Sequence, residues 1–311
     1  MGECDMKCQA QIRRAKLICC VVLVAASVPV APVAAQNQPV SLKVAAVQFR
    51  SSSRIEENAN RMRDILGRLA EDGVRVAVFP ECALTGYRKE AILSAKAEEV
   101  ASAEESIRGL CRQKKIAAIF GSVYKINGRI YNSAVVLDSQ GELVERYAKV
   151  YLAGEQWFTP GNHISYFELD GVPSTVMICH DERYPELVRL PAIQGARVAY
   201  YISHESGLRQ ESKLAPYRAQ LMARAVENRV FIVAANAPSD PKNLSGSHGQ
   251  SRIVNEDGNV MKEASFFGEE ILVETLPVKS AQLQRPLKEL MGDWWRQGVE
   301  SMMKNRRRPL D

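Results

Sequence analysis

Short apolar segments alternate with charged amphipathic segments along most of the chain. The apolar segments are rich in valine, isoleucine and alanine and predict buried strands, whereas the amphipathic segments repeat with a helical period. In the first half, this pattern predicts helices at residues 54–70 and 98–114, and strands at residues 41–49, 74–79, 116–124, 130–138 and 142–152. The dipeptide Asn127-Gly128, which separates two of these strands, predicts a hairpin turn.

The second half of the chain repeats this alternation. It predicts helices at residues 185–195 and 212–228, and strands at residues 173–179, 197–203, 229–237 and 269–277, with a further hairpin turned at Asp257-Gly258. No stretch between residues 41 and 277 has the composition of an interdomain linker. The pattern therefore predicts one α/β domain whose sheet or sheets are covered by helices.

The two ends of the chain differ from this domain. Three basic residues at positions 13–16 precede an uncharged run at residues 17–30, and small residues lead up to Gln36. We expect residues 1–35 to be a signal peptide for export to the periplasm or the medium, with no membrane attachment after cleavage. An N-terminal membrane anchor is the alternative, although two prolines interrupt the run. Residues 36–280 then form the domain, and residues 281–311 form a helical extension with a basic tail, which packs on a second subunit or on its own core.

Charge and cysteine content exclude some classes of function. The formal charge is +5 at pH 7, which is too small a bias to indicate a nucleic-acid partner. Four of the seven cysteines lie before residue 36, so the exported chain would keep Cys82, Cys111 and Cys179, an odd number that predicts at least one free thiol. We expect no metal and no other cofactor, because no histidine of the mature chain has a second ligand at a suitable spacing.

Two chemically useful side chains directly follow predicted strands. Glu81 comes after the strand at 74–79 and Pro80, which cannot continue a ladder, and Cys179 ends the strand at 173–179. Ligands of open α/β sheets bind outside the carboxyl ends of the strands. Lys149 is a third candidate, because it lies within the apolar run YAKVYL, although a lysine in such a run is commonly a surface residue.

Three separate motifs appear in one order along the chain. They are FPECALTGY at residues 79–87, Lys149 with Gly154-Glu155 and Pro160-Gly161, and CHDERYPE at residues 179–186. This set resembles the carbon–nitrogen hydrolase (nitrilase) superfamily, in particular its amidase and N-carbamoyl amidase branch. The resemblance implies a four-layer α-β-β-α sandwich with a catalytic triad. By that likeness Glu81 is the general base, Lys149 the cation and Cys179 the nucleophile, and Glu155 is a supporting glutamate.

The chemistry of amide hydrolysis explains why these residue types are needed. Attack by sulfur divides a slow reaction into two steps through a thioester. An ordinary cysteine is only a few per cent thiolate near neutrality, so Glu81 is expected to take the thiol proton and pass it to the departing nitrogen. Lys149 and the backbone N–H of His180 are expected to stabilise the oxyanion.

The residues that select the substrate are less well defined. Arg183 is interpreted as part of the turn after Cys179, or alternatively as the partner of a substrate carboxylate. The segment at residues 203–207 departs from the family's usual pattern, so His204 and Glu205 are interpreted either as pocket residues or as a solvated loop.

We expect hydrolysis of a small linear amide or N-carbamoyl compound with release of ammonia. The alternatives are nitrile hydrolysis, acyl transfer from the same thioester, and a non-catalytic binding protein. The resemblance also implies a homodimer or a higher homo-oligomer.

Overall fold

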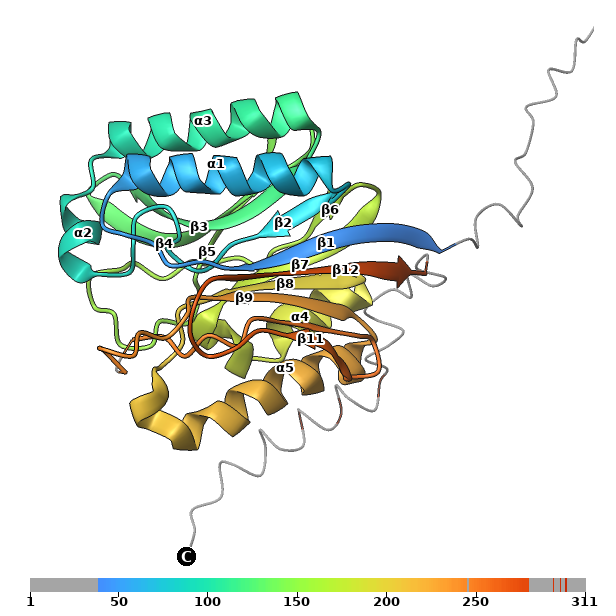
Figure 1. Ribbon diagram of the computed structural model, residues 1–311. Coiled ribbons are helices and arrows are strands. Elements are labelled where there is room, and N and C mark those ends of the chain that lie inside the picture. The colour runs from blue at the N-terminus through green and yellow to red at the C-terminus, as the bar shows by residue number, and fades with distance from the viewer. Residues whose placement is uncertain (1–38, 245, 280–292, 294–296, 298–299, 301–311) are drawn as a thin grey trace, which may run out of the picture. The chain divides into compact units, whose positions relative to one another are not determined.

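Two six-stranded sheets form the centre of the domain in the computed structural model, which describes residues 39–244, 246–279, 293, 297 and 300 (Figure 1). The first sheet has the order β12-β1-β2-β3-β4-β5. Its strands are β1 (Val40–Gln48), β2 (Val76–Val78), β3 (Ala117–Ile126), β4 (Arg129–Leu137), β5 (Leu143–Ala148) and β12 (Glu270–Val278).

The second sheet has the order β11-β10-β9-β8-β7-β6. Its strands are β6 (Phe167–Leu169), β7 (Val172–Ile178), β8 (Val198–Ser203), β9 (Phe231–Asn236), β10 (Arg252–Val254) and β11 (Val260–Glu263). In both sheets the three central strands are parallel, namely β1, β2 and β3 in the first and β7, β8 and β9 in the second. The flanking strands are antiparallel.

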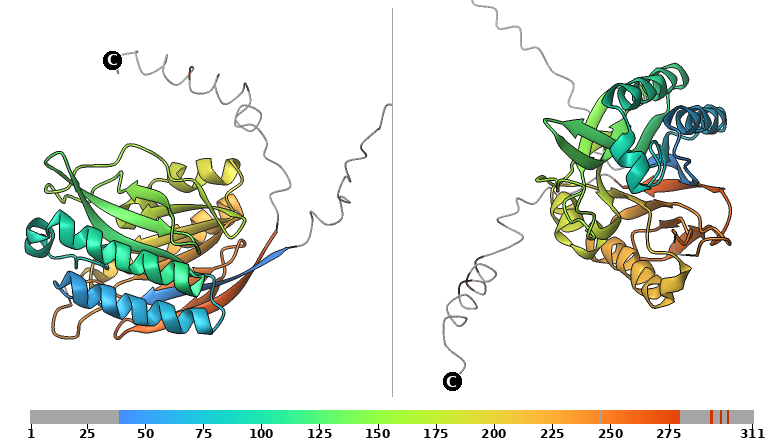
Figure 2. Two further views of the ribbon diagram at one scale, coloured as in Figure 1. Left: turned by 90° about the horizontal axis from the view of Figure 1, so that it is seen from above. Right: turned by 90° about the vertical axis from the view of Figure 1, so that its left-hand side faces the viewer.

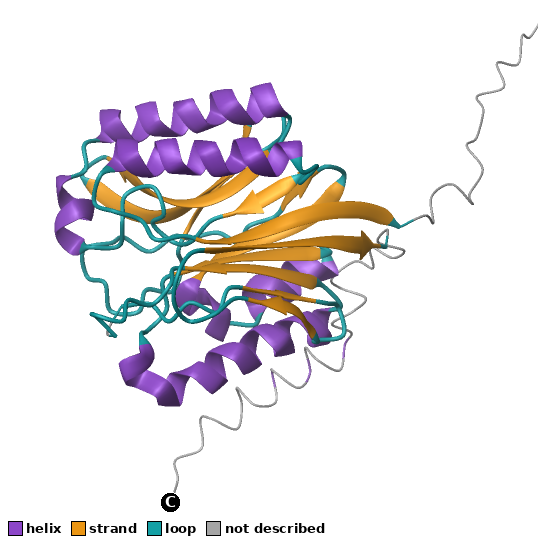
Figure 3. Cartoon of the chain, in the orientation of Figure 1, coloured by secondary structure: helices purple, strands orange, loops and turns teal. Residues whose placement is uncertain are grey.

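Helices cover the outer face of each sheet, as the purple helices on both sides of the orange strands show (Figure 3). The first sheet carries α1 (Ile55–Glu71) and α3 (Ala97–Lys114), and the second carries α4 (Glu186–Ile193) and α5 (Leu214–Asn228). The end-on view separates α1 and α3 from α5 by the two layers of strands (Figure 2). This is the four-layer α-β-β-α arrangement that the family resemblance implied.

Successive side chains along a strand point to opposite faces of its sheet, and this alternation explains how the strands contribute to three apolar layers, one between the sheets and one under the helices on each side. On β2, Val76 and Val78 face the core between the sheets, whereas Ala77 faces the helices. On β8, Tyr200 and Ile202 face the core between the sheets, and Tyr201 lies on the helix side. Because both faces of these strands are buried, they read as continuous apolar runs rather than as an alternation.

Most predicted elements are present within a few residues of their expected bounds, and both predicted hairpins form. The pattern missed the short elements α2 (Lys89–Ser94), β6, and the 3-10 helices η2 (Cys179–Arg183) and η3 (Leu208–Lys213). The predicted leader lies outside the described residues, as does most of the extension at 281–311. Within the described part of the chain, no helix is both long and apolar enough to cross a bilayer.

Candidate active site

Glu81 is held at the carboxyl end of β2 by a turn that is pressed against β3. The carbonyl of Pro80 accepts hydrogen bonds from the backbone N–H of Gly121 and of Ala83, at 3.0 and 3.2 Å. A Cβ atom on Gly121 would lie 2.1 Å from the backbone N of Cys82 and 2.6 Å from the carbonyl carbon of Glu81. Only glycine therefore lets β3 approach this turn, and the approach fixes the backbone of Glu81.

Lys149 is fixed in a comparable way, one residue after β5. Its backbone N–H donates to the carbonyl of Asn132 at 2.8 Å, and its own carbonyl accepts from the N–H of Gly161 at 2.8 Å. A Cβ on Gly161 would lie 2.1 Å from the carbonyl oxygen of Ala148. The Pro160-Gly161 motif thus has a physical role, because its glycine allows the loop to pack against the backbone that presents Lys149.

The side chain of Lys149 joins two buried carboxylates. Its Nζ lies 2.9 Å from Oε1 of Glu81 and 2.8 Å from Oε1 of Glu155. The exposed fraction is 0 % for Lys149, 1 % for Glu81 and 6 % for Glu155. Burial alone would lower the pKa of Lys149, but the nearby Cys179, Glu81 and Glu155 outweigh it and raise that pKa. Lys149 is therefore an ammonium ion in the folded protein.

Each carboxylate of this cluster has further hydrogen-bond donors. Oε1 of Glu81 accepts from Nδ2 of Asn132 at 2.6 Å, and its Oε2 accepts from the backbone N–H of His204 at 2.8 Å. Glu155 accepts from the hydroxyl of Tyr87 at 2.7 Å. Burial by itself raises the pKa of Glu155, but Lys149 and Tyr87 lower it, so this group is ionised. A buried ion cluster requires such complete pairing, since an unpaired charge is costly in a protein interior.

Cys179 follows β7 and has a backbone φ of 48°, so it begins η2 in a left-handed conformation that is unusual for a residue with a side chain. Asp181 holds this turn: it accepts from the backbone N–H of Ile178 and Tyr151 at 3.1 and 2.9 Å, and from the hydroxyl of Tyr147 at 2.8 Å. Burial raises the pKa of Asp181 to about 6, although these donors oppose the shift. Asp181 is thus an internally paired turn residue.

The thiol of Cys179 is electrostatically coupled to the ion cluster. Burial and then Glu81 raise the pKa of Cys179 well above its ordinary value, and Lys149 only partly opposes them. Cys179 is nevertheless partly exposed, whereas Cys82 and Cys111 are buried, and all three cysteines are free. The resting sulfur is therefore a thiol, and it can attack only if a nearby base removes its proton.

The residues expected to bind substrate lie in different environments. Arg183 is exposed at the end of η2, and no hydrogen bond or ion pair engages it in the described structure. The ring of His204 stacks on Tyr87 with 4.4 Å between centroids, and burial lowers its pKa. Glu205 is buried, so the interpretation of this segment as a solvated loop is wrong. Its carboxylate accepts a hydrogen bond from Tyr201 and lies 3.1 Å from Nε2 of His248.

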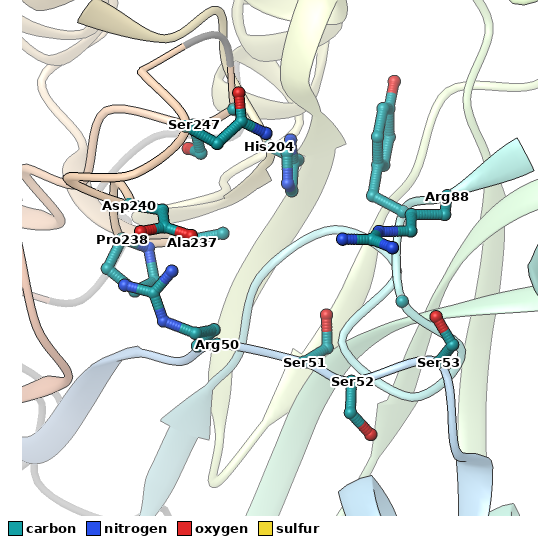
Figure 4. Close-up of a pocket in the computed structure, with 14 residues that line it drawn as sticks. Arg50, Ser51, Ser52, Ser53, Arg88, His204, Ala237, Pro238, Asp240 and Ser247 are labelled. Atoms are coloured by element: carbon teal, nitrogen blue, oxygen red, sulfur yellow. The ribbon is translucent and has the colours of Figure 1, made fainter.

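A pocket of about 500 Å³ opens beside His204 and Tyr87, the residues that contact Glu81 and Glu155 (Figure 4). Its lining combines polar side chains with apolar surface, and the guanidinium groups of Arg50 and Arg88 flank the hollow. The close-up shows Asp240 on the side of Arg50, and Ser51, Ser52 and Ser53 along the floor. Such a wall suits a small, charged or strongly polar ligand.

The sequence analysis missed Asn132 and Tyr87 as site residues. Asn132 lies directly before the apolar end of strand β4 together with Ser133, and a buried amide in a strand requires partners, which was the available signal. Tyr87 ends the FPECALTGY motif, but the sequence shows no reason for its role. Within the described residues, no group of three or more His, Cys, Asp or Glu side chains is placed to hold a metal ion.

Comparison with known proteins supports a common origin for this site. The sequence profile named carbon–nitrogen hydrolase matches residues 43–286. The chain is 30 % identical to the deaminated glutathione amidase of Escherichia coli O157:H7, over 78 % of this chain and 94 % of that protein. It is 32 % identical to the 2-oxoglutaramate amidase of Bacillus subtilis, over 60 % of this chain and 73 % of that protein.

A solved structure extends the likeness to the fold. An amidase from Nesterenkonia sp. AN1, a glutamate-to-glutamine variant whose active-site cysteine has added acrylamide, superposes with a TM-score of 0.70. The sequence identity is 26 %, and the match covers 81 % of this chain and 99 % of that chain. The profile, the relatives and the fold agree, and the chain belongs to the carbon–nitrogen hydrolase family.

Proposed function

We propose that this chain hydrolyses a small linear amide or N-carbamoyl compound through a thioester on Cys179, with release of ammonia. The observation that carries the proposal is the buried cluster of Glu81, Lys149 and Glu155 beside a partly exposed thiol whose pKa is raised. A thiol of this kind needs a general base, and Glu81 is the carboxylate that most strongly affects it.

The first half of the reaction uses Glu81 and Cys179. Two of the three donors on Glu81 bind Oε1, and the N–H of His204 binds Oε2, so Oε2 keeps a free lone pair for the thiol proton. As sulfur bonds to the carbonyl carbon, this proton moves to Glu81 and then to the leaving nitrogen. The C–N bond breaks, ammonia departs and the acyl group stays on sulfur as a thioester.

The second half uses water and the same carboxylate. Glu81 takes a proton from water as the oxygen attacks the thioester, and the proton is returned to sulfur when the C–S bond breaks. The tetrahedral intermediate of each half carries an oxyanion, for which we propose Lys149 and the backbone N–H of His180 as donors. Removing one such donor costs about 3–4 kcal/mol of barrier in comparable sites.

The pocket beside the cluster supports an acyl chain that ends in a carboxylate. Arg50 and Arg88 contribute two positive charges to its wall and Asp240 one negative charge, which leaves an excess of positive charge. The name of the relative called 2-oxoglutaramate amidase describes an amide that also carries a carboxylate. Arg183, which is exposed at the end of η2, remains a second candidate for this contact.

A substrate panel read out by ammonia tests the proposal. Amides with and without a terminal carboxylate, N-carbamoyl amino acids and nitriles are compared in wild type and Cys179→Ala, and added hydroxylamine traps the thioester as a hydroxamate. We expect turnover of the carboxylate-bearing amides and none in Cys179→Ala. Activity that survives in Cys179→Ala would show that the thioester mechanism is wrong.

Selective alkylation gives a second test with an internal control. Iodoacetamide should modify Cys179 and abolish turnover, whereas Cys82 and Cys111, which are 0 % exposed, should stay unmodified in the folded protein. Equal labelling of the three without loss of activity would contradict the assignment of the nucleophile.

We also propose that the protein is exported and then cleaved before Gln36, and that the mature enzyme is a homo-oligomer. The charge and hydropathy of residues 13–35 support the first proposal. Mass spectrometry of the mature protein and light scattering test the two proposals. A retained leader would contradict export with cleavage.

A further inference from the structure

A second buried polar cluster lies behind Cys179, on the helix side of the second sheet. It contains Tyr201, Glu205 and His248, with Glu182 and Arg252 close by, and all five are at least 95 % buried. The proposed reaction uses none of these side chains. Three atoms of the cluster have no hydrogen-bond partner among the described residues, namely Oε2 of Glu182, Nε2 of His248 and Nη1 of Arg252. The hydrogen bonds that link the cluster to Cys179 involve Tyr201 and Glu205.

His248 lies against Glu205, but its two ring nitrogens differ in their partners. Nδ1 of His248 lies 2.9 Å from the backbone carbonyl of Ser206, which can only accept, so Nδ1 carries a hydrogen. Nε2 of His248 lies 3.1 Å from Oε2 of Glu205, but it makes no hydrogen bond in the described structure. The two side chains are therefore in close contact where the segment after β8 meets the segment before β10.

The other oxygen of Glu205 reaches the backbone of the nucleophile through Tyr201. The hydroxyl of Tyr201 lies 2.6 Å from Oε1 of Glu205 and 3.1 Å from the carbonyl oxygen of Cys179. Burial and the carboxylates of Glu182 and Glu205 raise the pKa of Tyr201 well above its ordinary value, so its proton is retained. That proton bridges the Glu205 carboxylate and the Cys179 carbonyl, where η2 begins with its left-handed residue.

Glu205 is also linked to Glu81, the proposed general base. The backbone N–H of Glu205 donates to Oδ1 of Asn236 at 3.2 Å, and the adjacent His204 N–H donates to Oε2 of Glu81 at 2.8 Å. Anchoring Glu205 at its backbone and at Oε1 of its carboxylate therefore also anchors the amide that binds Glu81. One side chain is linked to the nucleophile on one side and to the base on the other.

We propose that Glu205 is a positioning residue of this active site, which acts through Tyr201 on the backbone of Cys179 and through the His204 amide on Glu81. The inference rests on the proposed role of Cys179. Glu205 touches neither substrate nor the reacting atoms. Its effect is to fix the position of the Cys179 sulfur relative to the Glu81 carboxylate.

The test compares Glu205→Gln with Glu205→Ala. The glutamine carbonyl can still accept from Tyr201, and its amide can donate to Nε2 of His248, so the geometry is kept and only the charge is lost. We expect Glu205→Ala to lower kcat about 100-fold with KM within about twofold, and Glu205→Gln to stay within about tenfold of wild type. Equal loss in both variants would overturn a positioning role.

The alkylation rate of Cys179 by iodoacetamide, followed by intact mass, gives a readout that needs no substrate. Both variants remove the negative charge by which Glu205 raises the pKa of Cys179, so their comparison isolates geometry, and the rate in Glu205→Ala should fall below the rate in Glu205→Gln. Failure of the proposed function can be told apart from failure of this inference. If the proposed function is wrong, Cys179→Ala retains turnover, whereas the alkylation rates of the Glu205 variants can still be compared. A wild-type alkylation rate and kcat in Glu205→Ala would overturn the inference.

Two further variants separate positioning from general stability. Glu104 on α3 is also a buried carboxylate, bonded to Ser122 and Arg146, and Glu104→Ala should lower the melting temperature without changing kcat per folded enzyme. If Glu205→Ala does not fold, Tyr201→Phe removes a single hydroxyl and keeps the ring. It should lower the Cys179 alkylation rate about tenfold, and an unchanged rate would overturn the inference.

Discussion

Replacing Gly161 by alanine tests whether the active site depends on close packing behind Lys149. The added Cβ would lie 2.1 Å from the carbonyl oxygen of Ala148, 2.8 Å from its carbonyl carbon and 3.0 Å from its Cβ. Contacts under 3.0 Å are essentially never seen for a real Cβ, so the loop and the end of β5 must separate by about 0.9 Å. Because the obstructing atoms are backbone atoms, no side-chain rotation relieves the clash.

The displacement acts on the residue next to Ala148. The carbonyl of Lys149 is bonded to the N–H of Gly161, so a shift of the loop moves the backbone that presents the ammonium group. A misplacement of about 1 Å in a catalytic array can cost roughly 100-fold in rate. Overpacking of this kind costs about 1–3 kcal/mol of stability. We expect Gly161→Ala to lose kcat about 100-fold and to unfold at a lower urea concentration.

The control is a glycine that leaves room for a methyl group. Gly109 lies within α3, and a Cβ there would meet nothing within 4 Å. Gly109→Ala should therefore stabilise the protein by about 0.5–1 kcal/mol through helix propensity alone and leave kcat unchanged. Ammonia release and urea titration of the two variants measure both quantities. A fully active Gly161→Ala enzyme of wild-type stability would refute the packing argument.

Three other changes test the charged cluster. Asn132→Ala removes a donor at 2.6 Å from Glu81 and should cost about 1.5–3 kcal/mol of transition-state stabilisation, seen as a loss of kcat/KM with little change in melting temperature. Lys149→Met leaves two buried carboxylates unpaired and should destabilise the fold by about 3–5 kcal/mol at neutral pH; wild-type stability in urea would contradict the ion cluster. Burial lowers the pKa of His204 below 6.5, so its contribution to stability is present above that pH and is lost as the pH falls below it. His204→Phe keeps the stack on Tyr87, and its unfolding free energy should therefore fall less than that of wild type between about pH 7.5 and about pH 5; equal losses would disprove this account.

The elements of this fold were predictable because both faces of the central strands are buried. Strands such as β8 read as continuous apolar runs, and the two hairpin dipeptides carry their own turn chemistry. Short elements such as α2 and β6 were not predictable, since tertiary contacts rather than local periodicity determine segments of this length. Glu81, Lys149 and Cys179 were chosen through motifs; the structure places Lys149 in an ion pair with Glu81, and the catalytic roles of the three residues stay a prediction.

The supporting residues of the site escaped prediction for a different reason. Asn132, Tyr87 and Tyr201 act across distances of 51, 68 and 22 residues along the chain, on Glu81, Glu155 and Cys179 respectively. Hydrogen bonds between such distant positions leave no periodic trace in one sequence. Glu205 shows the same limit, because a charged residue after a strand is usually solvated, and only the fold reveals that it is buried.

The charge of the cluster explains how a free cysteine can rest unreacted in an enzyme built to use it. Burial and then Glu81 raise the pKa of Cys179, Glu205 adds to the effect, and Lys149 only partly opposes them, so the surroundings of Cys179 favour the neutral thiol. Lys149 therefore does not act by creating a resting thiolate. In the proposed mechanism it is paired with Glu81, the proton acceptor, and it offers its charge when the oxyanion forms. The nucleophile is produced only when a carbonyl is in place to receive it, and a thiol is far less open to oxidation than a thiolate. Lowering the negative charge, as in Glu81→Gln, should consequently raise the thiolate fraction of Cys179 and its rate of alkylation at neutral pH while lowering turnover. A fall in both rates would contradict this division of roles.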